Sequence, residues 1–122
     1  IPKDRAAGVT STAVKVSSGA LEHLPVCRVT NLNRLAEQLK EAGWWILGTD
    51  GEAETNLWDL SGLPDKLAVV IGSEGKGMGR ALAAKCDFLA SIPLSGGLES
   101  LNASTATAVV LFELKRRRAG KD

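Results

Sequence analysis

A continuous apolar run followed at once by clustered glycines is the feature that most limits how this chain can fold. The run is Leu67–Ile71 (LAVVI), and Gly72, Gly75, Gly77 and Gly79 follow it. A strand that is apolar at every position, rather than at alternate ones, is typical of a strand buried on both faces. Such strands occur in parallel sheets whose faces are covered by helices, so the run favours an α/β fold.

Strand-like and helix-like segments alternate along the rest of the chain. Asn31 is a good N-cap, and the apolar residues after it recur at positions 32, 35, 36 and 39, one face of a helix. The expected strands are Pro25–Thr30, Trp44–Gly48, Leu67–Ile71 and Phe88–Ile92, and the expected helices are Thr10–Ser18, Asn31–Ala42, Met78–Lys85 and Leu101–Arg116. This alternation predicts one three-layer α/β domain over residues 1–122, built on a mainly parallel sheet.

Three of the expected strands end in unusual residues. These ends are Gly48–Thr49, Gly72–Gly75 and Ile92–Leu94. In parallel α/β sheets the carboxyl ends of the strands meet at one edge, and ligands bind there. We therefore expect a ligand site formed by the three loops that follow these strands.

The glycine-rich loop after Ile71 does not match the common phosphate-binding patterns. From Gly75 it has G-x-G-x-G with Arg80 at the sixth position, so the dinucleotide fingerprint fails, and the P-loop spacing fails as well. Glu74 would also repel a phosphate, which favours a ligand that offers hydroxyl groups or a positive centre. A plain tight turn is the alternative, because glycine also permits positive φ there.

Composition and charge exclude several classes of protein. The chain is 44% hydrophobic and 24% charged with a net charge of +1, which is typical of a soluble globular domain. No apolar run approaches the ~20 residues of a membrane helix, and residues 1–10 lack the apolar core of a signal peptide.

The two cysteines, Cys27 and Cys86, form neither a CxxC nor a metal-ligand pair, so we expect small buried residues in a reducing compartment. A cytoplasmic protein without a metal site or membrane contact is predicted.

Basic residues crowd the C-terminal end, at Lys115–Arg118 and Lys121. A run of this kind is typical of a solvated helix end, where cations also suit the helix dipole. Contact with nucleic acid is the alternative.

Three stretches together resemble a single family. "VVIGSEGKGMGRALAAKCD" and "IPLSGGLESLNASTATAVVLFE" resemble motifs 2 and 3 of the SpoU (TrmH-like) RNA 2′-O-ribose methyltransferases of the SPOUT class. "KVSSGALEHLPVCRVTNLNRLAEQLKEAGWWILGTD" resembles the segment that leads into those motifs. Within the family, GALEHLPV and VTNL most resemble the bacterial 23S rRNA guanosine 2′-O-methyltransferase group.

The resemblance implies both a topology and an activity. The C-terminal part of such domains threads through a loop in a deep trefoil knot, and S-adenosylmethionine binds bent inside it. The implied reaction transfers a methyl group to a ribose 2′-hydroxyl in RNA, with a 23S rRNA guanosine as the expected target and a tRNA ribose as the alternative. Because the transfer is an in-line displacement, most of its catalysis comes from positioning.

The resemblance also implies which residues form the site. By position, the cofactor-binding residues are Thr49, Gly51, Gly72, Glu74, Gly75, Ile92, Leu94, Ser100, Leu101 and Asn102. Backbone groups at Gly72, Ile92 and Leu101 are the implied adenine and ribose contacts. Glu74, Ser100 and Asn102 occupy the family's invariant polar positions and are the catalytic candidates. Alternatively, Ser100 and Asn102 cap the last helix, and Glu74 lies in a surface turn.

One family motif does not occur in this sequence. Motif 1, with the pattern N-x-G-x-x-x-R, carries an arginine that is implied to help remove the hydroxyl proton. We therefore expect a domain without the upstream first strand and motif 1, and turnover only by a longer form. The alternatives are a fragment that binds cofactor or RNA without turnover, and an unrelated Rossmann-like nucleotide enzyme, which the failed fingerprint disfavours.

The last expected helix is apolar on more than one face. Its apolar residues are Ala106, Val109, Val110, Leu111, Phe112 and Leu114. A helix of this kind must be buried or covered by a partner. The resemblance implies a homodimer with its active sites near the subunit interface, so we expect a homodimer whose interface includes the 101–116 helix.

Overall fold

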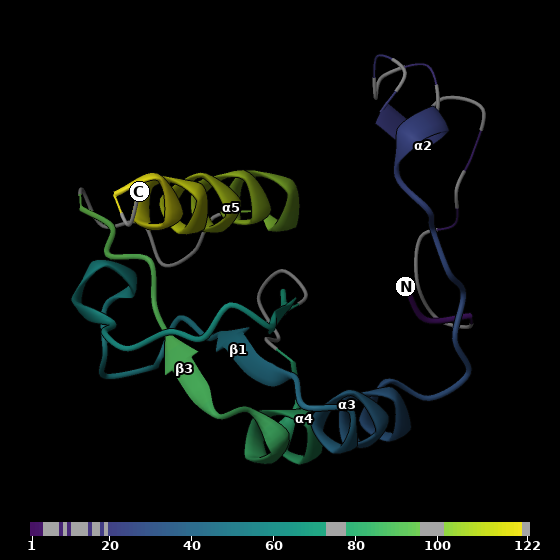
Figure 1. The fold of residues 1–122 in the computed structure, drawn as a ribbon, viewed down its shortest axis with the longest axis horizontal. Helices are drawn as coiled ribbons and strands as arrows, with labels where there is room; N and C mark the ends of the chain where they lie inside the picture. Colours follow the sequence, from purple (N-terminus) through teal and green to yellow (C-terminus); the bar gives the residue numbers. More distant parts are fainter. Residues whose placement is uncertain are drawn as a thin grey trace. The chain divides into compact units, whose positions relative to one another are not determined.

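A parallel sheet forms the centre of the fold in the computed structural model, which describes residues 1–3, 8, 10, 15, 18, 20–72, 78–95 and 102–120. Within these residues the strands are β1 (Trp45–Thr49), β2 (Leu67–Val70) and β3 (Phe88–Ala90), in the order β2-β1-β3 (Figure 1). Both pairings are parallel, with Leu47 opposite Val69 on one side and Phe88 on the other. The α/β fold with a parallel sheet is confirmed.

The strand buried on both faces is β1, not β2. Ile46 and Leu47 of β1 are at most 1% exposed, whereas every residue of β2 is half-buried. The reason is the strand order, since β1 has a neighbour on each side and β2 has one neighbour among the described strands. The apolar run Leu67–Ile71 was therefore correctly predicted as a strand, but its expected burial was wrong.

Three of the four expected helices form with shifted ends, namely Asn31–Ala42, Met78–Lys85 and Leu101–Arg116. Among the described residues the structure has α2 (Ala20–His23), α3 (Leu32–Glu41), the 3₁₀ turn η1 (Leu57–Asp59), α4 (Arg80–Lys85) and α5 (Ala103–Ala119). Helix α4 begins two residues later than expected because Gly79 has φ of 82°, outside the helical region. None of the helices in this part of the chain combines the length and the hydropathy of a membrane span.

The two faces of β1 meet different helices (Figure 1). Leu47 belongs to a core cluster with Leu57, Ala90 and Val110 of α5. The next residue, Gly48, faces the opposite side of the sheet, because successive positions of a strand alternate between its two faces. A Cβ at Gly48 would lie 2.6 Å from Met78 Cε and 2.7 Å from Cys86 Sγ, at the two ends of α4. The expected three layers are therefore α5, the sheet and α4.

Asp87 secures the end of the sheet opposite the three loops. Its Oδ2 accepts a hydrogen bond from the Ile46 backbone N–H at 2.8 Å, and its own N–H donates to Ile46 O at 2.8 Å. Lys40 of α3 forms an ion pair with Asp87 at 3.3 Å and donates to Lys85 O at 3.0 Å. These contacts join α3, β1 and the start of β3.

Residues 1–35 form a separate compact unit. The predicted strand Pro25–Thr30 was wrong, because its pairing is limited to one parallel bridge between Pro2 and Val29. Among the described residues, Val29 donates to Ile1 O at 2.8 Å and accepts from the Lys3 N–H at 2.7 Å, and a single bridge does not make a ladder. Most of the expected helix Thr10–Ser18 lies outside the described residues.

The two cysteines have different surroundings. Cys86 is half-buried, and burial raises the pKa of its thiol, with a smaller contribution from Asp87. Cys27 is exposed, so the prediction that both are buried was wrong for Cys27. No three His, Cys, Asp or Glu side chains in the described ranges lie close enough together to hold a metal ion.

Candidate functional site

The carboxyl ends of the three strands meet at one edge of the sheet. Thr49, the last residue of β1, joins two of them through its hydroxyl group. Its Oγ1 donates to Val70 O at 3.3 Å and accepts a hydrogen bond from the Gly72 N–H at 3.4 Å. Thr49 and Gly72, both predicted as site residues from separate loops, are thus brought together.

The loop after β1 is a tight turn. The Asp50 N–H donates to Ala90 O of β3 at 3.0 Å, and the Asp50 Oδ1 accepts from the Glu52 N–H at 3.0 Å. The Ala53 N–H donates to Asp50 O at 3.0 Å. Gly51 therefore lies exposed at a turn whose backbone is held from both sides.

The loop after β3 begins with a buried serine that sequence reasoning missed. Ser91 is 8% exposed and forms a parallel bridge with Asn56. Its N–H donates to Thr55 O at 2.9 Å, and its carbonyl accepts from the Leu57 N–H at 2.8 Å. This bridge ties the loop after β1 to the loop after β3. The available signal was a serine directly after the apolar strand Phe88–Ala90.

The predicted residues of the third loop divide into packing and capping positions. Ile92 packs against the core cluster, and Leu94 is half-buried beyond it. Asn102 is the N-cap of α5, where its Oδ1 accepts from the Thr105 N–H at 2.8 Å. Such a cap satisfies one of the free N–H groups of the first helical turn. Among the described contacts, this cap uses only the carbonyl oxygen of the side chain, which leaves the Nδ2 amide group to donate to a ligand.

Several predicted site residues fall outside the described residues. They are Glu74, Gly75, Ser100 and Leu101. The described part of the site is therefore Thr49 with Gly72, Gly51 in the first turn, Ile92 and Leu94 in the third loop, and Asn102 at the start of α5.

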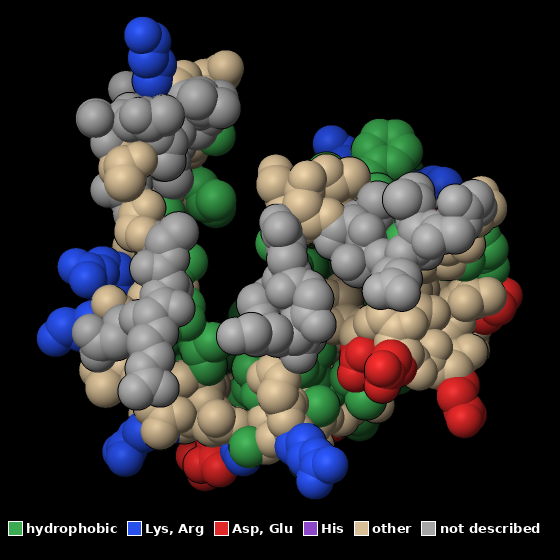
Figure 2. Space-filling model, turned by 180° about the vertical axis from the view of Figure 1, so that it is seen from behind, with side chains coloured by type: hydrophobic (Ala, Val, Ile, Leu, Met, Phe, Trp, Pro, Cys, Tyr) green, Lys and Arg blue, Asp and Glu red, His purple; other side chains and the backbone are tan. Residues whose placement is uncertain are grey.

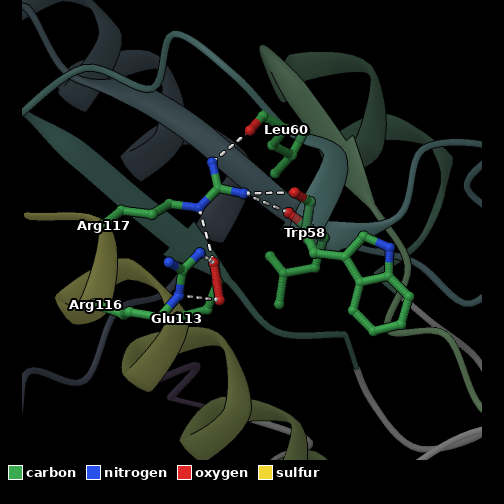
Figure 3. Close-up of polar contacts among 6 residues, drawn as sticks. Trp58, Leu60, Glu113, Arg116 and Arg117 are labelled. Atoms are coloured by element: carbon green, nitrogen blue, oxygen red, sulfur yellow. Dashed lines mark hydrogen bonds and ion pairs between the residues drawn. The ribbon is translucent and has the colours of Figure 1, made fainter. Parts of the chain in front are cut away.

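Arg117 of α5 binds the backbone of η1 and is not solvated as the sequence suggested (Figure 3). Its Nη2 donates to Leu57 O at 3.0 Å and to Trp58 O at 3.1 Å, and its Nη1 donates to Leu60 O. Nearby, Arg118 Nη2 donates to Asp65 O at 2.6 Å. The expectation of a solvated basic run was therefore wrong for Arg117, because its guanidinium lies within hydrogen-bond distance of backbone carbonyls of η1.

Glu113 completes this cluster. Its Oε1 accepts from Arg117 Nε at 3.1 Å, and its carboxylate also binds Arg116 (Figure 3). The hydrogen bond from Arg116, followed by that from Arg117, holds the pKa of Glu113 below its ordinary value. The i, i+4 spacing of Glu113 and Arg117 was the sequence signal for the pair.

An apolar groove lies between η1 and α5. Its volume is about 440 Å³, and it is lined by Leu57, Trp58, Ala108, Val109, Phe112 and Glu113. Phe112 is 74% exposed and Trp58 62% exposed. Hydrophobic and basic side chains lie side by side at the surface over α5 (Figure 2). One face of α5 is thus packed on the sheet while another stays open.

The fold is an α/β domain in which the carboxyl ends of three parallel strands lie at one edge of the sheet. The chain belongs to the SpoU rRNA methylase family, whose model matches residues 1–112. The family was correctly identified from the motifs after β2 and β3.

Curated relatives and solved structures agree with this membership. The chain is 52% identical over 119 residues to YacO of Bacillus subtilis, whose name places it among TrmH family tRNA/rRNA methyltransferases. It is 50% identical over 117 residues to the 23S rRNA (guanosine-2′-O-)-methyltransferase RlmB of Coxiella burnetii. These matches cover 97% and 96% of this chain but 47% and 46% of the relatives, so the chain spans about half their length.

Among solved structures, the chain is similar to the SpoU methyltransferase AviRb from Streptomyces viridochromogenes in complex with AdoMet. The TM-score is 0.86 at 28% identity, over 98% of this chain and 49% of that one. The similarity therefore extends over nearly the whole of this chain.

Proposed function

We propose that this chain carries the S-adenosylmethionine site of an RNA ribose 2′-O-methyltransferase. The observation that supports this proposal most is the match of residues 1–112 to the SpoU family. In this chain the carboxyl ends of all three strands lie at one edge of the sheet. The AdoMet complex of AviRb, similar at a TM-score of 0.86, supports the choice of cofactor.

The chemistry of the loops suits this cofactor. S-adenosylmethionine has ribose hydroxyl groups and a positively charged sulfonium. An acidic residue in a glycine-rich loop, here Glu74, suits a ligand with either feature. In the proposal, backbone groups at Gly72, Ile92 and Leu101 hold the adenosine, while Glu74, Ser100 and Asn102 supply polar groups. Thr49, Gly51, Gly75 and Leu94 complete the pocket wall. The deep trefoil knot implied by the family is part of the proposal.

A 23S rRNA guanosine is the preferred substrate in this proposal. It is supported by 50% identity to a relative whose name states that activity. A tRNA ribose is the second candidate, because the name of the 52% identical relative covers both tRNA and rRNA. Mapping which ribose loses its methyl group when the gene is deleted decides between them, and unchanged methylation of both RNAs would contradict the proposal. An RNA substrate of this kind implies a cytoplasmic location.

Binding and turnover can be tested separately. Calorimetric titration of the 122-residue chain with S-adenosylhomocysteine is expected to show binding, with NAD as the matched control. A folded sample that binds NAD instead would overturn the cofactor assignment. In a methyl-transfer assay we expect turnover from a form extended upstream to include motif 1, and binding without turnover from this chain. Turnover by the 122-residue chain would contradict the need for motif 1.

We also propose a homodimer whose interface includes the open face of α5. Phe112 and Trp58 expose apolar surface next to the groove, and burying it would remove contact with water. Light scattering that finds only monomer at micromolar concentration would contradict this assembly.

A further inference from the structure

We infer that Arg117 is a positioning residue for the cofactor site, because it fixes the far end of the loop that carries Gly51. This inference rests on the proposed function, since it assigns Arg117 a role in the same pocket. Arg117 itself contacts the backbone of η1 and none of the predicted cofactor residues that the structure describes.

The guanidinium of Arg117 is almost fully engaged inside the chain. It has five N–H donors. Nη2 uses two on Leu57 O and Trp58 O, Nη1 uses one on Leu60 O, and Nε uses one on the carboxylate of Glu113. Its side chain is 19% exposed. Counted over the part of the chain that the structure describes, one donor is left, so Arg117 is a poor candidate for an RNA phosphate contact and a good one for holding backbone.

The loop from Asp50 to Leu60 is tied down at three points. The Asp50 N–H donates to Ala90 O at 3.0 Å, and Asn56 bridges Ser91 in the middle of the loop. Arg117 supplies the last tie, and it is the one that comes from α5 rather than from β3. Gly51 lies between the first tie and the second, and Arg117 holds η1, which follows the second tie.

Loss of the Arg117 tie leaves the η1 end of this loop held by the bonds of Asn56 and Leu57 to Ser91 and by the buried side chain of Leu57, so the segment from Trp58 to Leu60 loosens. A mobile loop must be ordered again when a ligand binds, and that cost weakens binding. Charge-assisted hydrogen bonds are also stronger than neutral ones, so a neutral side chain does not replace them. Arg117 therefore acts on the cofactor through loop 50–60.

Arg116 provides a matched control for the experiment. It lies next to Arg117, binds the same Glu113 carboxylate and carries the same charge, but its side chain is 64% exposed and its described bonds do not reach η1. The variants Arg117→Gln and Arg116→Gln remove the same charge from the same helix turn. Only the first removes the bonds to η1.

The first measurement is calorimetric titration of the full 122-residue chain with S-adenosylhomocysteine. We expect Arg117→Gln to weaken binding by about tenfold, the effect of losing a hydrogen bond to a charged group. Arg116→Gln should bind within about twofold of the unaltered chain, and Arg117→Lys should recover part of the loss because it keeps a cationic donor. Equal affinity of folded Arg117→Gln and Arg116→Gln would overturn the inference.

The second measurement does not depend on any ligand. Amide hydrogen exchange of the peptide over residues 50–60 should speed up in Arg117→Gln and stay unchanged in Arg116→Gln. Unchanged exchange in Arg117→Gln means that Arg117 does not hold the loop, which sinks the inference even if that variant binds weakly. If the unaltered chain fails to bind S-adenosylhomocysteine, the proposed function fails, while the exchange result still decides whether Arg117 holds the loop.

Discussion

Glu113 Oε1 accepts a hydrogen bond from Arg117 Nε at 3.1 Å, one helical turn apart on α5. The carboxylate thereby orients a guanidinium whose other donors reach the backbone of η1, some 60 residues earlier in the chain. A local pair on one helix thus joins the C-terminal helix to the loop that follows β1.

The pH dependence of this pair is predictable in sign. The hydrogen bonds from Arg116 and Arg117 lower the pKa of Glu113 in the folded chain below its ordinary value of 4.5. A carboxyl with a depressed folded-state pKa adds stability above its unfolded pKa and loses it as the pH falls through the folded value. The Glu113→Gln variant should therefore be less stable than the unaltered chain at neutral pH. This difference should shrink in acid.

Urea unfolding of the unaltered chain and of Glu113→Gln, from neutral pH into acid, measures the difference in their free energies of unfolding. A difference in the free energy of unfolding that persists below the folded-state pKa of Glu113 would show that the carboxylate charge is not its source.

Gly48→Ala should destabilise the fold by overpacking. The added Cβ would lie 2.6 Å from Met78 Cε and 2.7 Å from Cys86 Sγ. Overpacking of a well-packed core costs about 1–3 kcal/mol. Gly8→Ala is the control, because nothing lies within 4 Å of a Cβ there. Thermal unfolding should lower the Tm for Gly48→Ala alone, and equal Tm values would mean that α4 moves freely to accommodate the methyl group.

Substitutions at Asn102 should separate the helix cap from the cofactor contact. Asn102→Ala removes the acceptor for the Thr105 N–H and should cost about 1 kcal/mol of stability. Asn102→Ser keeps a capping oxygen but lacks the Nδ2 amide, so it should be as stable as the unaltered chain and bind S-adenosylhomocysteine more weakly. Denaturant unfolding and calorimetry measure the two effects. Unaltered affinity in Asn102→Ser would leave Asn102 as a cap alone.

Phe112→Ser should weaken self-association. Phe112 is 74% exposed in the single chain, so its loss costs the monomer little, whereas a central aromatic of an interface contributes about 2 kcal/mol or more. Leu24→Ser is the control, since Leu24 is 63% exposed and does not line the groove. Analytical ultracentrifugation should show a dimer that dissociates at least about tenfold more readily in Phe112→Ser. The same change in Leu24→Ser would point to a different interface.

The salt dependence of RNA binding should change when basic residues of α5 that are free to contact phosphate are replaced, and not when the replaced residue is engaged within the chain. Each phosphate contact contributes about 0.7 to 0.9 to the slope of log affinity against log salt. Replacing Lys115 and Arg116 by Gln should therefore reduce this slope by about 1.5 for RNA bound by the chain. Arg117→Gln should leave it unchanged, because its donors are already used on the carbonyls of Leu57, Trp58 and Leu60 and on Glu113. Filter binding over a salt series measures the slopes, and equal losses in all variants would contradict this division.

Much of the fold could be predicted because its signals are local. The spacing of Leu32, Leu35, Ala36 and Leu39 predicts α3, and the apolar runs around Leu47 and Val69 predict two paired strands. The residues after β1, β2 and β3 were correctly expected at one edge, since parallel strands leave no other arrangement. The family, too, could be identified from continuous motifs in the chain.

Other features depend on contacts between distant segments. Pro25–Thr30 has the composition of a strand, yet among the described residues it forms one bridge, between Val29 and Pro2. Burial of β1 rather than β2 follows from strand order, which no single strand encodes.

Helix periodicity, capping and the motif residues were therefore readable from the amino acids alone, because each depends on neighbours within a few positions. The role of Arg117 was not, since its partners are the carbonyls of Leu57, Trp58 and Leu60. Backbone carbonyls are the same in every residue and leave no mark in the sequence. Only the packing of α5 against the sheet brings this guanidinium within hydrogen-bond distance of them.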